Sequence, residues 1–397
     1  MTPALSAVER ALRTAAPYAL LDALRENLTR LYGVTTTELL LADYSLTVLQ
    51  RVTELPLTTE PISVHTSAAG RAFGSQLPHT EAARDTGRVI LHLPVTVRGD
   101  RLGVLSLGLR ATDLTPGLRD EFCEIAEILG HQIVVADRDT DLYLQARRKD
   151  RLTLAAEMQW QLLPARACAR EEYAVGAQLE PAYAIHGDNF DWSATEDRLT
   201  LTITNGMGEG IDASMLTNLA VNALRNARRA GVTIADQAAL ADQAVYARHR
   251  GEAYLSVLLL EFHLDTGLVE VVDAGSPQLH RLRNGTVSHV PFEAQLPLGL
   301  ADDTPYEAQR IRVQRGDRLI FVSDGVHAVA SKVGEIYGRA ALARAIQSTR
   351  LLPAAEVPRA ILTELATYRD DDPQDDALIV CLDWNGRHPS SEDARPS

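Results

Sequence analysis

The chain has 397 residues, 46% of them hydrophobic and 23% charged, which is typical of a globular protein long enough for two domains. Its formal net charge of −14 argues against a nucleic-acid or anionic-membrane partner, because phosphate groups select basic surfaces. Three scattered cysteines without a C-x-x-C pair argue against a disulfide framework and a zinc site. The first residues lack the pattern of a signal peptide, and no apolar run approaches the roughly 18–20 residues of a membrane span, so we expect a cytoplasmic protein.

Residues 1–138 are expected to form an α/β/α domain. Apolar residues at helical spacing predict helices over 7–31 and 118–136, and Ser67 begins a shorter helix over 67–73. Strands are predicted over 38–43, 46–52, 89–97 and 102–109, and the last two form a hairpin at Gly99-Asp100.

This order of elements resembles the GAF family of small-molecule and redox-sensing domains. The resemblance rests on Gly70-Arg-Ala-Phe73 and on Leu93-Pro-Val, Gly99 and Leu102-Gly-Val-Leu105. It implies a pocket between sheet and helices for an unknown small ligand. Two alternatives stay open for this domain, a ligand sensor or a unit that only dimerises.

Residues 139–164 are expected to form a linker helix that ends at Pro164, since proline cannot continue a helix. An apolar stripe runs along it, through Leu142, Ala146, Leu152, Ala156 and Leu163. A helix in this position can pass a rotation or register change between two domains.

Four loops with acidic or amide side chains punctuate residues 165–385, each beside a predicted strand. They are His186-Gly-Asp188, Asn205-Gly-Met-Gly-Glu-Gly210, Ser323-Asp-Gly325 and Gln374-Asp-Asp376. Oxygen ligands delivered by strand ends and glycine turns are typical of Mg²⁺ or Mn²⁺ sites. Mutual repulsion also makes clustered carboxylates costly unless cations balance it. Asp376 and Asp191 have a simpler alternative, in which they cap a helix or face solvent.

In order and spacing these loops resemble the SpoIIE-like branch of the type 2C metal-dependent serine/threonine phosphatases. Ala274-Gly-Ser-Pro277, Gln295-Leu-Pro-Leu-Gly299 and Arg315-Gly-Asp-Arg-Leu319 match further elements of that branch, and Met158 to Pro164 resembles the segment before its core. The resemblance implies an α-β-β-α sandwich with two metal ions at one edge. It places Asp188, Asn205, Asp324 and Asp375 at metal positions, with the backbone carbonyl of Gly206.

The central loop departs from the family pattern Gly-Asp-Val-x-Gly-His-Gly. The aspartate that bridges both metals in the family is Asn205 here, and the histidine is Glu209. An amide oxygen is neutral and cannot bridge two cations as a carboxylate does. One ion in place of two is therefore an alternative, and Glu209 is a candidate to restore the lost charge beside Asp188 in catalysis.

The fold class is thus α+β: a GAF-like domain over 1–138, a linker helix over 139–164, a phosphatase domain over 165–385 and a disordered tail over 386–397. Two functions remain open. The first is a Mn²⁺- or Mg²⁺-dependent phosphoserine/phosphothreonine phosphatase controlled by the GAF-like domain, with an anti-sigma-factor antagonist as a plausible phosphoprotein substrate in bacterial stress signalling. The second is a weakened or inactive phosphatase-like scaffold. The sequence leaves the substrate and the oligomeric state open, with a homodimer as one alternative.

Overall fold

The computed structural model describes residues 2–52, 60–83, 87–180, 187–275, 277–331, 334–338, 340–369 and 375–387. His186, Ser276, Gln374 and residues 388–397 of the predicted tail lie outside the described residues. The chain divides into two compact units, Met1–Arg151 and Leu152–Ser397, and each is described by itself. No helix among the described residues is long and apolar enough to cross a membrane.

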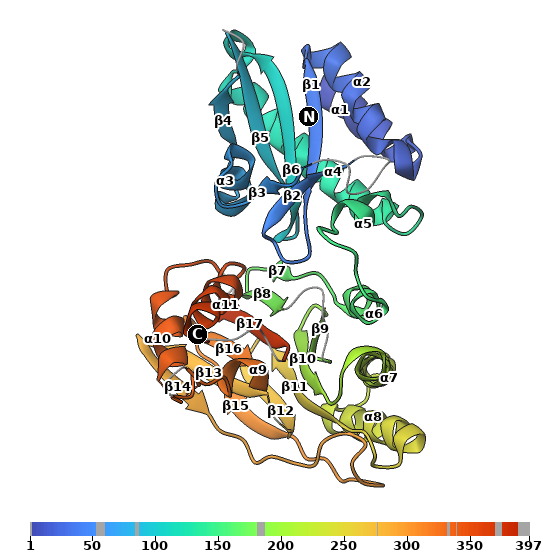
Figure 1. Cartoon of the computed structure of the whole chain (residues 1–397), viewed down its shortest axis with the longest axis vertical. Helices are drawn as coiled ribbons and strands as arrows, with labels where there is room; N and C mark the ends of the chain where they lie inside the picture. Colours follow the sequence, from blue (N-terminus) through green and yellow to red (C-terminus); the bar gives the residue numbers. More distant parts are fainter. Residues whose placement is uncertain are drawn as a thin grey trace, which may run out of the picture. The chain divides into compact units, whose positions relative to one another are not determined.

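Unit 1 is a three-layer α/β/α arrangement around one antiparallel sheet of strand order β3-β2-β1-β6-β5-β4 (Figure 1). Its elements are α1 (Pro3–Thr14), α2 (Leu20–Tyr32), β1 (Thr36–Ala42), β2 (Val48–Arg51), β3 (Ile62–Ser63), α3 (Ala68–Ser75), β4 (His79–Ala82), β5 (Arg88–Val97), β6 (Asp100–Arg110), α4 (Pro116–Ala136) and α5 (Leu142–Ala146), with 3-10 turns at Pro17–Ala19 and Ala111–Asp113. The predicted hairpin is present, because β5 and β6 pair along their length.

Apolar clusters cover both faces of this sheet. Alternating residues of β1, β5 and β6 pack against α1, α2 and α4 on one face. On the other face Leu40, Val64 and Val104 pack against Phe73 of α3. The structure does not identify unit 1 as a GAF domain, and its ligand remains a prediction.

Two predicted helices are wrong in their continuity. The helix expected over 7–31 is divided into α1 and α2 at Pro17, since the residue before a proline avoids the helical conformation. The linker expected over 139–164 is two short helices, α5 and α6 (Leu154–Leu162). Tyr143 and Ala146 of α5 belong to the core of unit 1 and Ala155 and Ala156 of α6 to that of unit 2, so packing against two cores outweighs helix propensity along this segment.

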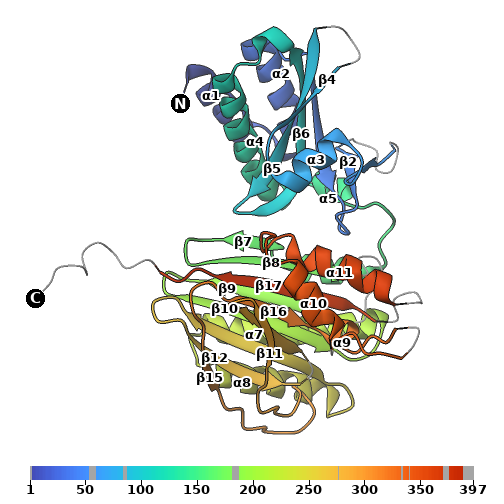
Figure 2. The ribbon, with the colours of Figure 1, turned by 90° about the vertical axis from the view of Figure 1, so that its left-hand side faces the viewer.

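Unit 2 has four layers, with two antiparallel sheets between two groups of helices (Figures 1 and 2). Its strands are β7 (Ala167–Ala169), β8 (Tyr173–Glu180), β9 (Asn189–Ala194), β10 (Arg198–Gly206), β11 (Leu255–His263), β12 (Leu268–Ala274), β13 (Gln278–Arg283), β14 (Thr286–Val290), β15 (Gln309–Arg312), β16 (Arg318–Val322) and β17 (Ala377–Trp384). Its helices after α6 are α7 (Gly210–Arg229), α8 (Ile234–His249), α9 (Asp324–His327), α10 (Ala341–Ser348) and α11 (Val357–Tyr368).

The strand orders are β15-β12-β11-β10-β9 and β14-β13-β16-β17-β8-β7. Alternate residues of each strand face the other sheet, and among them are Ile203, Leu260, Phe321 and Val380 in the shared core. The opposite faces pack against α7 and α8 on the first sheet and α10 and α11 on the second. This is the α-β-β-α sandwich that the sequence predicted.

Candidate metal centre at one edge of the sandwich

Four loops meet at one edge of unit 2. The end of β10 lies beside the start of β9, and the end of β16 lies beside the start of β17, because both pairs are antiparallel. The carboxylate of Asp376, just before β17, joins the two sheets at this edge. Its Oδ2 accepts hydrogen bonds from the backbone N–H groups of Gly187 at 3.0 Å and Asp188 at 3.2 Å.

Asp188 is the most buried of the three aspartates predicted as metal ligands, with 2% of its surface exposed. Burial raises the pKa of its carboxyl well above the usual value, and the Asp376 carboxylate raises it further. Asp324 and Asp375 add smaller effects of the same sign, while a hydrogen bond from Ser323 opposes them. The Oδ2 atom of Asp188 is buried without a hydrogen-bond partner among the described residues. Acids from three of the four loops therefore share one site at which a charged Asp188 is costly.

Asp324 and Asp375 lie at the ends of the two central strands of the second sheet. Asp324 Oδ1 accepts from the backbone N–H of Gly325 at 2.9 Å and also from the side-chain Nδ2 of Asn205. Asp375 is exposed, and its Oδ1 accepts from the backbone N–H of Asp376 at 2.8 Å. Asn205 thus presents an amide donor to Asp324, at the position where the family carries a bridging carboxylate.

Two glycines allow these loops to approach one another. A Cβ atom at Gly325 would lie 1.8 Å from the backbone oxygen of Asp376, and one at Gly206 would lie 2.7 Å from Thr217 Oγ1. Thr217 also donates to the backbone oxygen of Gly187 at 2.8 Å. Gly325 is required by close packing of backbone on backbone, and Gly206 by the approach of the Thr217 side chain.

Sequence reasoning missed Gln159 and misjudged Asp376. Gln159 of α6 is 1% exposed, and its Nε2 donates to the backbone oxygen of Asp188. Asp376 is fully buried and holds two backbone N–H groups, so the cap or solvent-facing role was wrong. The resemblance of Met158–Pro164 to the segment before the family's core pointed to the region of Gln159, but it did not show which of its side chains turns inward.

Glu209 and Asp191 do not join the acidic group. Glu209 is exposed at the N-cap of α7, and no side-chain hydrogen bond of its own is found within the described chain. Asp191 is buried and paired with Arg225 at 2.8 Å and Arg228 at 3.0 Å, both on α7. This corrects the view of Asp191 as a cap or solvent-facing side chain: the ion pairs tie α7 to β9.

The residues fit one divalent cation better than two. A buried carboxylate oxygen without a partner, beside three further acids, is the donor set of a hard cation. At Asp324, however, the amide of Asn205 already satisfies an oxygen that a second cation would take. In this geometry the ligand atoms of Asp188, Asp324 and Asp375 do not all lie within 4.8 Å of one another, so the predicted sharing of one cation by all three is not reached.

The one described group of three side chains that meets that distance is elsewhere, on the first sheet. It comprises Glu261, His263 and Glu270, half-buried on neighbouring strands. Arg198 pairs with Glu261 at 2.6 Å and Arg310 with Glu270 at 2.8 Å. These cross-strand ion pairs account for the group without a metal.

Comparisons with known proteins agree with this fold. Residues 195–385 match the family model described as Stage II sporulation protein E (SpoIIE). The phosphoserine phosphatase RsbU of Bacillus subtilis (strain 168) is 20% identical over 259 residues, which are 65% of this chain and 77% of the relative. The SiaA-PP2C domain of Pseudomonas aeruginosa has a TM-score of 0.50 and 20% identity, covering 58% of this chain and 94% of that one. The RsbU and RsbW domains of a Mycobacterium tuberculosis protein have a TM-score of 0.48 and 20% identity, over 55% of this chain and 63% of theirs, which is less than two thirds of their length.

Proposed function

We propose that the chain is a metal-dependent phosphoserine and phosphothreonine protein phosphatase, because residues 195–385 match the SpoIIE family model and the chain is similar to the phosphoserine phosphatase RsbU. The observation that supports this most is the buried Asp188, whose Oδ2 has no hydrogen-bond partner in the part of the chain that the structure describes and which has three acids around it. Such an arrangement is costly for a protein and is balanced when a cation binds.

Asp188, Asp324 and Asp375 would hold the cation, with the backbone carbonyl of Gly206, once their carboxylates move closer together than they lie in this structure. A bound Mn²⁺ or Mg²⁺ supplies a water of lowered pKa and neutralises charge on phosphoryl oxygens. Asp376 fixes the Gly187–Asp188 backbone, and the Gly325 N–H orients Asp324. Asp188 holds the charge of its carboxylate where water is excluded, which strengthens its attraction to a cation.

The activity is expected to be low, because Asn205 gives Asp324 a hydrogen bond in place of a shared metal. Asn205→Asp should raise the turnover of p-nitrophenyl phosphate and lower the Mn²⁺ concentration required, since a second carboxylate replaces a neutral amide. Calorimetric titration with Mn²⁺ should find one ion in the parent and two in the variant.

A variant of Glu209 tests whether its carboxylate replaces the aspartate that is missing at position 205. If its carboxylate has taken over the missing charge, Glu209→Gln removes activity and Asn205→Asp changes little. The exposed position of Glu209 favours the opposite result. If the parent and both variants bind no metal and turn nothing over, the enzyme proposal fails and the scaffold is the better account.

The Asn205–Asp324 hydrogen bond is also the observation that favours the scaffold, because it closes part of the site without a metal. A scaffold would bind phosphoprotein without hydrolysing it. Binding without turnover at saturating Mn²⁺ separates the two functions.

We further propose control of unit 2 by unit 1 through residues 139–164, in the cytoplasm and on an anti-sigma-factor antagonist phosphoprotein. The sequence similarity to RsbU supports the substrate, and the Gln159 contact with the Asp188 backbone supports the route. Deleting residues 1–151, which keeps α6, should change the rate or the Mn²⁺ requirement. Gln159→Ala in the full chain should reproduce part of that change.

A further inference from the structure

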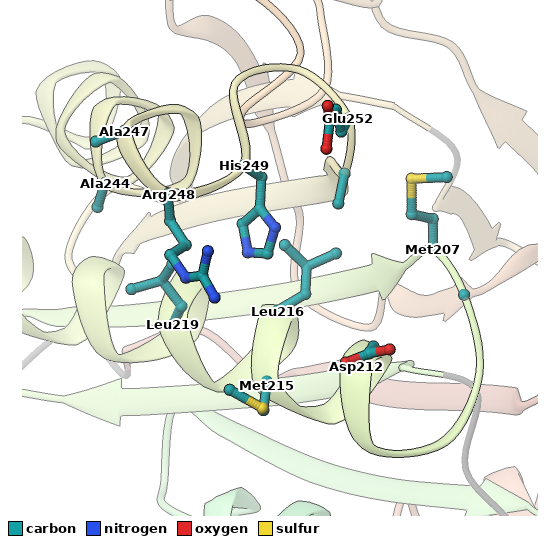
Figure 3. Close-up of a pocket in the computed structure, with 12 residues that line it drawn as sticks. Met207, Asp212, Met215, Leu216, Leu219, Ala244, Ala247, Arg248, His249 and Glu252 are labelled. Atoms are coloured by element: carbon teal, nitrogen blue, oxygen red, sulfur yellow. The ribbon is translucent and has the colours of Figure 1, made fainter.

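A groove runs between the antiparallel helices α7 and α8, with a volume of about 860 Å³ (Figure 3). We call it the α7–α8 groove. Met215 and Leu219, four residues apart on α7, form one wall, and Ala244 and Ala247 of α8 form the other. Small side chains facing long flexible ones leave room for an apolar ridge, which is the shape that accepts an amphipathic helix. Met215 is 50% exposed, so this apolar wall faces solvent.

One end of the groove is joined by the chain itself to the candidate metal centre. Met207 and Gly208 close one of its ends, and they directly follow Asn205 and Gly206 in the chain. Met207 is 41% exposed. A polypeptide whose modified residue lies at the acidic edge can therefore extend from there into the groove.

Charged and polar side chains line the groove in a fixed order. Asp212 and Glu252 lie toward the Met207 end, while Arg248 and His249 extend from α8 toward α7 (Figure 3). Within the described ranges, no hydrogen bond or ion pair involves any of these four side chains. The groove thus has negative charge near the metal centre and an unpaired guanidinium farther along, and it prefers a partner with the complementary order.

We propose that the α7–α8 groove holds an amphipathic helical segment of the phosphoprotein substrate, adjacent in sequence to its phosphorylated serine or threonine. This rests on the proposed phosphatase function and names the substrate feature that the enzyme reads. The helix carries a basic residue near the phosphorylated one, apolar residues three and four apart, and an acidic residue about two turns on, opposite Arg248. Asp212 and Leu219 are two turns apart on α7, about 10 Å, and this sets the length of the matching segment.

Three synthetic phosphoserine peptides test this with the full chain. The first has the helix described above, the second has its apolar residues replaced by serine, and the third has its basic and acidic residues exchanged. Binding is measured by fluorescence anisotropy, and KM is measured with Mn²⁺. The first peptide should bind about ten-fold more tightly than the second and several-fold more tightly than the third.

Variants locate the effect. Met215→Glu should bring the affinity ratio of the first and second peptides close to one, and Arg248→Glu should bring the ratio of the first and third close to one. Leu240→Glu is the matched control, since Leu240 is 45% exposed on α8 and does not line the groove, and it should leave both ratios unchanged.

Equal binding of the first and second peptides by the parent protein overturns the proposal, whatever the turnover. Tight binding of the first peptide that is unaffected by removal of its phosphate and does not compete with hydrolysis also overturns it, because the occupant is then a regulator. The proposed function fails separately: with no hydrolysis of p-nitrophenyl phosphate or any peptide, intact binding ratios would still establish the groove.

Discussion

Each unit of the molecule buries a loop aspartate, Asp43 in unit 1 and Asp188 in unit 2. Hydrogen-bond donors surround Asp43, whereas other acids surround Asp188. In unit 1, Asp43 accepts hydrogen bonds from the backbone N–H groups of Thr47 at 2.8 Å and Val48 at 3.0 Å, and so closes the β1–β2 turn. In unit 2, Asp188 has a carboxylate oxygen that finds no partner among the residues described for this unit, and three acids lie nearby. Burial alone therefore does not mark a functional acid. The number of hydrogen-bond donors around the carboxylate separates the two cases, because a buried negative charge without donors needs a cation to balance it.

The largest expected effect comes from replacing each of these acids by its amide. Asp188→Asn should lower Mn²⁺-dependent turnover about a thousand-fold, or about 4 kcal/mol of barrier, because a charged metal ligand is lost. In the metal-free protein it should raise the melting temperature, since it removes a buried charge that its neighbours disfavour.

Asp43→Asn is the matched control. It should leave turnover nearly unchanged and destabilise unit 1 by about 1–3 kcal/mol, because an amide Nδ2 cannot accept the hydrogen bonds that Asp43 Oδ2 takes from the backbone N–H and the hydroxyl of Ser45. Calorimetry and turnover on the same samples check both variants. A lower melting temperature for metal-free Asp188→Asn would mean that Asp188 is structural like Asp43.

The next largest effect is expected at two glycines, one in each unit, that pack directly against the backbone of another strand or loop. A Cβ would lie 1.9 Å from the Leu40 oxygen at Gly103 in unit 1 and 1.8 Å from the Asp376 oxygen at Gly325 in unit 2. Gly103→Ala and Gly325→Ala should each cost about 3 kcal/mol of unfolding free energy. Only Gly325→Ala should also weaken Mn²⁺ binding, because it separates Asp324 from Asp376. Equal Mn²⁺ affinity in both variants would contradict the placement of the site at this edge.

The smallest effect is a pH response of opposite sign in the two units. Burial in unit 2 lowers the pKa of His280 to about 4, with help from His289 and His327, and burial in unit 1 raises the pKa of Asp137 to about 6. The unfolded state binds more protons at His280 between pH 6.5 and 4, so that stabilisation is lost on acidification. The folded state binds more at Asp137 between pH 3.8 and 6, so that contribution is lost as pH rises.

Between pH 7 and 4.5 the His280 effect and the Asp137 effect should each reach about 2 kcal/mol, with opposite signs. Tryptophan fluorescence follows unit 2, which contains Trp160, Trp192 and Trp384, and circular dichroism follows the whole chain. The pH dependence of the unfolding free energy is measured for the parent and for His280→Asn or Asp137→Asn, and the difference between parent and variant isolates each contribution. If the two contributions changed the unfolding free energy with pH in the same direction, these burial effects would not govern the pH response.

Local pattern was sufficient to predict much of the sandwich. Alternation along β10 and the acids placed just outside β16 and β17 could be read from neighbouring residues, and so could the layer order through the resemblance they carried. Asp376 accepts its hydrogen bonds from the N–H groups of residues almost 190 positions earlier in the chain, so no local pattern reveals them. Likewise Gln159 looks like any polar residue of a short helix until α6 packs on the loop before β9.

The position of β17 has a consequence for biosynthesis. This strand comes late in the chain but lies in the middle of its sheet, between β16 and β8. A nascent chain that has not yet presented residues 375–384 leaves both neighbours with open backbone edges, which are templates for aggregation. It also lacks Asp375 and Asp376. The acidic edge can therefore assemble only after nearly all of unit 2 has left the ribosome, and a prematurely released product would be both inactive and prone to aggregate.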